Sequence, residues 1–130
     1  MTLPSISLPF SFANVYEGFA KAQGILRVDE NALTLEFEIK DNLFGVLKSG
    51  IKEVIIPIQY IESVTLNKSW LRTALVVRVQ RLKLLSYIPK HDQGQVWLYI
   101  SRNDRYIASQ VASFLRLRIS ENEINLLDTN

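Results

Sequence analysis

The stretch NDRYIASQVASFLRLRI, residues 103–119, decides our expectation of the fold. Its apolar side chains recur at positions i, i+4, i+7 and i+8 and form one helical stripe: Ile107, Val111, Phe114 and Leu115. Asn103 is a suitable N-cap, because its side chain can accept a hydrogen bond from a backbone N–H of the first turn. The chain before this stretch has the pattern of strands. We therefore expect one amphipathic helix that closes an open end of a sheet.

The strands are predicted by the alternation of apolar and polar side chains. Residues 33–39 give the clearest pattern, with leucine, phenylalanine and isoleucine at the odd positions and threonine and glutamate between them. Residues 19–28 precede them, and the turn Asp29-Glu30-Asn31 joins the two runs into a predicted hairpin. Further strands are expected at residues 52–58, 73–79 and 95–100, which makes about seven strands in all.

The two ends of the chain are predicted to lie outside the folded domain, which we expect at residues 16–119. Residues 1–15 are extended in character because each proline biases its predecessor toward β or polyproline geometry. They are read either as a disordered start or as an N-terminal arm that lies on the domain or on a second copy. Residues 120–130 are polar with an acidic bias, and we expect a flexible tail there.

Composition indicates one ordinary globular domain. The chain has 130 residues, 48% of them hydrophobic and 22% charged, with a formal net charge of +2. It contains no cysteine, so disulfides and thiolate chemistry are excluded. The first cation after the initiator is Lys21, so no basic segment of a signal peptide precedes it. No apolar run reaches the roughly 18 residues of a membrane span. We expect a cytoplasmic protein.

The order of these elements resembles the bacterial pleckstrin-homology-like domains and the related GRAM-type domains over about residues 16–118. The resemblance rests on the phrase IP-x-x-x-I-x-x-V from Ile56 to Val64, on the arginine-bearing strand LVVRV, and on the R-x-D-R junction from Arg102 to Arg105. It implies a mainly β fold: a barrel of two orthogonal antiparallel sheets, closed at one corner by the C-terminal helix. It also implies that the chain is not an enzyme.

Catalytic and metal-binding motifs were sought residue type by residue type. His91 is the sole histidine and lies in a polar loop, and zinc would need a cluster of carboxylates that the sequence lacks. The segment GVLKSGIK superficially resembles a phosphate-binding loop, but Ile51 stands where its lysine must be. Glu36 and Glu38 share one face of a strand and are read as a solvated surface. We expect no catalytic residue, no metal and no cofactor.

Cations and aromatic residues give the candidate binding residues. The strongest local charge signal suggests contacts to an anion or to anionic lipid: Lys68, Trp70, Arg72, Arg81 and Lys83. Inositide-binding relatives concentrate cations around their first hairpin, but the acidic turn Asp29-Glu30-Asn31 would repel phosphate here. Nucleic acid is not expected as a partner.

Spare apolar side chains give candidate contacts with a partner or a second copy: Phe44, Leu47, Trp97 and Tyr99. Trp97 and Tyr99 point away from the aliphatic face of their strand, and either pack under another segment or form an exposed patch. The leading hypothesis is a non-enzymatic, pleckstrin-homology-like interaction module that self-associates and binds a protein partner. The alternative is a peripheral membrane adaptor that binds anionic lipid through a basic and apolar loop face.

Overall fold

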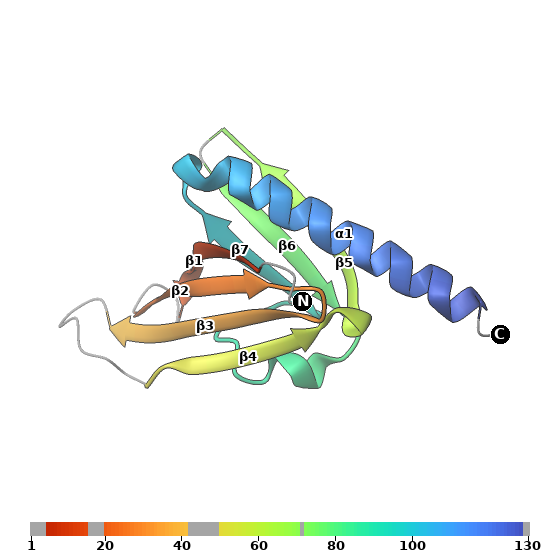
Figure 1. The fold of residues 1–130 in the computed structure, drawn as a ribbon. Helices are drawn as coiled ribbons and strands as arrows, with labels where there is room; N and C mark the ends of the chain where they lie inside the picture. The colour runs from red at the N-terminus through yellow and green to blue at the C-terminus, as the bar shows by residue number, and fades with distance from the viewer. Residues whose placement is uncertain (1–4, 16–19, 42–49, 71, 129–130) are drawn as a thin grey trace.

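Period-two alternation becomes seven antiparallel strands of one sheet in the computed structural model, which describes residues 5–15, 20–41, 50–70 and 72–128. The strands are β1 (Ile6–Val15), β2 (Ala20–Val28), β3 (Ala32–Asp41), β4 (Lys52–Pro57), β5 (Ile61–Lys68), β6 (Thr73–Val79) and β7 (Gln95–Ile100). Their order in the sheet is β4-β3-β2-β1-β7-β6-β5 (Figure 1). The mainly β prediction is confirmed. The two separate sheets expected are one continuous sheet, because β1 pairs with both β2 and β7.

The largest difference from expectation is the N-terminal segment. Residues 6–15 were expected in an arm, but they form β1, which lies inside the sheet between β2 and β7. Leu8, Phe10 and Phe12 are buried in the core, so the alternation in this segment was a strand pattern. Pro9 is tolerated because β1 pairs only with β2 at that position, where Pro9 faces Ile25, and its missing N–H breaks no ladder bond toward β7.

The predicted hairpin forms β2 and β3, paired in register from Ala20 and Asp41 to Val28 and Leu33. The carboxylate of Asp29 accepts hydrogen bonds from the backbone N–H groups of Asn31 and Ala32, at 2.8 and 3.0 Å, and holds the turn. Gly24 on β2 lies close against the backbone of β3. A Cβ at this position would be 1.8 Å from the carbonyl oxygen of Glu36, so only glycine fits.

Helix α1 (Arg105–Asp128) lies across the sheet and covers β5 (Figure 1). One side of it is buried in the core through Ala108, Val111, Ala112 and Leu115. Two of its arginines, Arg116 and Arg118, donate hydrogen bonds to backbone carbonyls outside the helix. Arg116 donates from Nε to the carbonyl of Val64 at 3.0 Å, and Arg118 donates to the carbonyl of Glu30 at 3.0 and 3.2 Å. The predicted role of this helix as a cover for the sheet is thereby explained.

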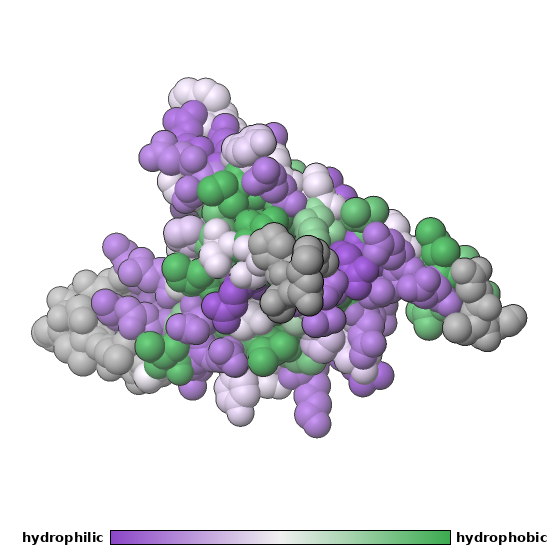
Figure 2. Space-filling view, in the orientation of Figure 1, coloured by the Kyte–Doolittle hydropathy of each residue, from purple (hydrophilic) through white to green (hydrophobic). Residues whose placement is uncertain are grey.

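The helix is longer than predicted, and it includes residues that were expected in a flexible tail. Residues 120–128 continue α1, because no glycine or proline stops it and Arg118 forms an ion pair with Glu121 one turn on. This last part extends past the sheet in Figure 1, and Figure 2 shows apolar atoms gathered at that end. Ile124 and Leu127 are 57% and 74% exposed there.

Short 3₁₀ turns complete the fold. The chain bends after Pro57, as expected, and the turn η2 (Ile58–Tyr60) leads from β4 into β5. The connection from β6 to β7 contains η3 (Leu82–Leu85), which packs against β4 and buries Leu85 and Ile88. The core is thus covered by α1 along β5 and by this connection beside β4.

Candidate binding site on the outer face of β7

The outer face of β7 carries two aromatic side chains, Trp97 and Tyr99. They alternate with Val96, Leu98 and Ile100, which are buried in the core. The two rings are stacked, with centroids 6.3 Å apart and planes inclined by 29°. Trp97 remains 38% exposed, and it is one of the large hydrophobic side chains that face solvent.

The two rings also shield the neighbouring strand. Tyr99 stands opposite Ala74 on β6, and Trp97 stands opposite Val76. Ala74 and Val76 are only 2% and 7% exposed, although both belong to the outer face of their strand. One side of the pair therefore packs on small β6 side chains, and the other side is open to solvent.

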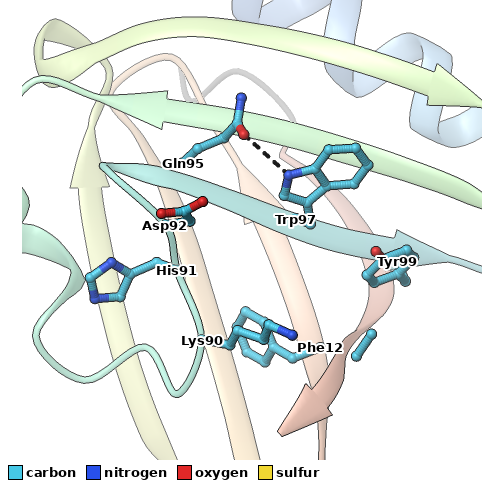
Figure 3. A pocket seen from close by; sticks show the side chains of 8 residues that line it. Phe12, Lys90, His91, Asp92, Gln95, Trp97 and Tyr99 are labelled. Carbon is cyan, nitrogen blue, oxygen red and sulfur yellow. Dashed lines mark hydrogen bonds between the residues drawn. The ribbon is translucent and has the colours of Figure 1, made fainter.

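Polar contacts fix the pair in place. The guanidinium carbon of Arg72 lies 4.9 Å from the centre of the Tyr99 ring, which is a cation–π contact. The indole Nε1 of Trp97 donates to Oε1 of Gln95 at 3.3 Å (Figure 3). Three of the residues predicted as binding candidates, Arg72, Trp97 and Tyr99, are thus brought together on one face.

The sheet has a seam beside these rings, between β1 and β7. In the described residues the two strands share one register pair, Ser11 with Tyr99. Gln95 bonds in both directions with Asp92, at 2.9 and 3.0 Å. Hydrogen-bonding directions alternate along a strand, so the backbone N–H and C=O of Trp97 point to the same side as those of Gln95 and Tyr99. These groups of Trp97 therefore face the seam, where no register pair joins the strands.

A pocket of about 290 Å³ occupies the seam (Figure 3). Its walls come from β1, from β7 and from the loop before β7: Phe12, Ala13, Lys90, His91, Asp92, Gln95, Trp97 and Tyr99. His91 is exposed and lies at one margin of the pocket, apart from the aromatic pair (Figure 3). The pocket combines an apolar wall with a few polar groups, as small binding sites usually do.

A tight turn presents the next group of predicted residues. The Oγ of Ser69 donates to the carbonyl of Arg72 at 2.8 Å and accepts from the Arg72 N–H at 2.9 Å, which closes the β5–β6 turn. Arg105, the first residue of α1, donates to the carbonyl of Ser69 at 3.0 Å and to the buried hydroxyl of Thr73 at 2.5 Å. Lys68 is exposed here, and Trp70 stands 82% exposed at the tip of the turn.

The predicted basic cluster is divided by β6. Seven residues of extended chain, roughly 23 Å, separate Arg72 at one end of this strand from Arg81 and Lys83 beyond the other end. Arg81 lies over the ring of Tyr60, with 4.2 Å between guanidinium carbon and ring centre. Arg81 and Lys83 thus belong to a different part of the surface. Phe44 and Leu47 lie outside the described residues.

The described part of the chain contains no group of three or more His, Cys, Asp or Glu side chains that could hold a metal ion. None of its helices is long and apolar enough to cross a membrane. Comparisons with models of known families, with curated proteins and with solved structures found no match.

The sequence did not identify the pocket residues that come from elements distant from β7 along the chain. Phe12 was assigned to the arm, and Lys90 and His91 to a plain loop. The alternation of residues 6–12 was the local signal for Phe12, and it is compatible with a strand as well as with an arm. No local signal in the sequence identifies Lys90, because it joins the pocket through the path of the β6–β7 connection.

Proposed function

We propose that this chain is a non-enzymatic, pleckstrin-homology-like interaction module that binds an extended segment of a protein partner along β7. Strand order and shape support the family-like architecture: the axes of β2–β4 lie at an angle to those of β6 and β7, and one register pair, Ser11 of β1 with Tyr99 of β7, links the two parts of the sheet (Figure 1). Helix α1 covers β5, as in the expected barrel.

The seam beside Trp97 is the observation that carries this proposal. An extended peptide pairs with a strand edge through backbone hydrogen bonds and gains specificity from side-chain pockets. The N–H and C=O of Trp97 supply such an edge, the indole and Tyr99 supply an aromatic platform, and the 290 Å³ pocket receives one side chain. A partly exposed tryptophan beside an arginine is also the usual composition of a binding hot spot.

The test is selection of binders from random ten-residue peptides, followed by affinity measurement on two tryptophan variants. Trp97→Ala removes the platform and should weaken binding about 30-fold or more, the effect of a hot-spot residue. Trp70→Ala is the matched control, because it removes an equally large side chain that does not line the seam pocket, and it should leave the affinity unchanged. Equal losses in the two variants would refute a site on β7.

We also propose self-association through the end of α1. Leu117, Ile124 and Leu127 recur at i, i+7 and i+10, so they share one side of the helix, and they are 58%, 57% and 74% exposed. A second copy of the helix can cover such a stripe. Light scattering after size exclusion should give a mass above one chain that returns to the monomer in Ile124→Asp. A monomer at tens of micromolar concentration would contradict self-association.

A second candidate function, contact with an anionic membrane, is favoured by the exposed tip of the β5–β6 turn. Trp70 stands between Lys68 and Arg72, and Tyr106 at the start of α1 is 74% exposed. Interfacial tryptophan and tyrosine with flanking cations are typical of membrane-surface contacts. Sedimentation with phosphatidylserine vesicles should then be salt-sensitive and reduced by Trp70→Ala but not by Trp97→Ala. Absence of sedimentation at low ionic strength would exclude this function.

A further inference from the structure

A second hollow opens beside the seam. It has a volume of about 510 Å³ and shares Phe12, Ala13 and Tyr99 with the seam pocket, so the two spaces adjoin across the Tyr99 ring. Its far walls come from β2, from the β5–β6 turn and from the residues that precede α1. A ligand that leaves the edge of β7 at Tyr99, where β1 pairs with this strand, and crosses the Tyr99 ring on the outer face enters this hollow.

Three cations line the hollow, and in the described part of the chain none of them forms an ion pair. Lys21 comes from β2, Arg72 from the turn and Arg102 from η4 (Arg102–Asp104), and all three are exposed. Within the described residues no Asp or Glu lines this space, and the two ion pairs found there are Lys40 with Glu38 and Arg118 with Glu121. Like charges grouped without counter-charges favour the binding of an anion.

Arg72 and the backbone beside Arg102 are held in position before any ligand arrives. The backbone of Arg72 is fixed by its two hydrogen bonds with Ser69, and its guanidinium rests on the Tyr99 ring at 4.9 Å. The backbone beside Arg102 is fixed by Ser101, whose hydroxyl accepts from the Asn103 N–H. A preorganised group of donors loses less entropy on binding than one that must be assembled.

We propose that this hollow receives an anionic side chain, a carboxylate or a phosphate, of the same extended partner segment that the seam binds. The proposal rests on the proposed function, because the seam supplies the path into the hollow. It also fixes a spacing. The Trp97 and Tyr99 rings are 6.3 Å apart, about two residues of extended chain. The anionic residue should therefore lie two to four positions from the residue that contacts Trp97, before it in a segment antiparallel to β7 and after it in a parallel one.

The experiment uses the best ten-residue peptide selected by the wild-type protein. Each of its positions is replaced in turn by Glu, by Gln, by phosphoserine and by serine. At one position, within the spacing above, Glu or phosphoserine should bind about tenfold more tightly than its neutral counterpart, as a charge-assisted contact predicts. Arg72→Gln and Lys21→Gln should abolish this preference. Lys83→Gln, an exposed cation at the other end of β6, is the control and should retain it.

The outcomes separate this inference from the proposed function. If peptides bind, Trp97→Ala removes binding and Glu and Gln remain equal at every position, the anion hollow is wrong and the seam stands. If no peptide binds, both are overturned. If Arg72→Gln lowers binding to phosphatidylserine vesicles but leaves the peptide preference intact, the cations serve a membrane and the inference fails.

A second measurement does not depend on any peptide. Inorganic phosphate titrated against sodium chloride of matched ionic strength should shift backbone amide resonances around Lys21, Arg72 and Arg102. Shifts of the same size around Arg116 and Arg118 would mean non-specific screening and would overturn the site.

Discussion

Replacement of Gly24 by alanine should destabilise this protein more than the size of one methyl group suggests. The new Cβ would lie 1.8 Å from the carbonyl oxygen of Glu36 and 2.6 Å from the Cα of Phe37. An ordinary carbon–oxygen contact is about 3.3 Å, so β2 and β3 would have to separate locally by roughly 1.5 Å. Overpacking costs about 1–3 kcal/mol, and each lost ladder bond adds about 1 kcal/mol. We expect a total loss of about 3–5 kcal/mol, in the upper tail of single substitutions.

The assay is urea denaturation followed by circular dichroism, with the free energy of unfolding extrapolated to water. Gly50→Ala is the matched control, because a Cβ on Gly50 meets nothing within 4 Å. It should change stability by no more than about 1 kcal/mol, toward greater stability, since alanine restricts the unfolded chain. A Gly24→Ala protein within about 0.5 kcal/mol of wild type would refute the close approach of β2 and β3.

Three further predictions concern the core and the site. Leu115→Ala should cost about 2–5 kcal/mol in the same denaturation assay, whereas Gln110→Ala, exposed on the same helix, should cost under about 0.5 kcal/mol; equal costs would contradict the assigned buried face of α1. Thr73→Val removes the acceptor of an Arg105 hydrogen bond and should cost about 1–3 kcal/mol, and an unchanged denaturation midpoint would contradict that bond. Iodide should quench the tryptophan fluorescence of Trp97→Phe, which retains Trp70, more strongly than that of Trp70→Phe, which retains Trp97. The reverse order would contradict the stacked arrangement of Trp97.

The strands and the existence of the helix were predictable because each has a local periodicity of apolar residues. Residues 33–39 alternate so regularly that β3 follows from them alone. The buried stripe of α1 likewise follows from spacing, since Val111 and Leu115 are buried as expected. Such periodicities depend on neighbours a few residues apart, and one sequence contains them in full.

The place of β1 was not predictable, because it depends on pairing between distant segments. Leu8, Phe10 and Phe12 alternate equally well in an arm and in a strand. Whether they enter the sheet is decided by the residues opposite, on β2 and at Tyr99 of β7. The length of α1 was underestimated for a related reason, since polar residues after Ile119 can continue a helix that projects into solvent.

The candidate site was predictable only in part. Trp97 and Tyr99 were recognised by their phase on a strand, and Arg72 by its charge. Their meeting depends on the register of β6 and β7, which places Thr73 opposite Ile100 and so brings Arg72 to Tyr99. Arg81 resembled Arg72 in sequence, but the length of β6 separates them. The seam itself arises where β1 and β7 diverge, and no residue type in the sequence predicts that divergence.

The central claim is that the edge of β7 beside Trp97 binds an extended partner segment. Hydrogen–deuterium exchange measures it most directly, residue by residue, with and without the selected peptide. In the free protein the Trp97 amide should exchange faster than the Leu98 amide, whose strand neighbour on β6 is Leu75. The account predicts that the peptide slows exchange at Trp97 and leaves Leu98 unchanged. Exchange at Trp97 that is already as slow as at Leu98, or that the bound peptide does not alter, would contradict it.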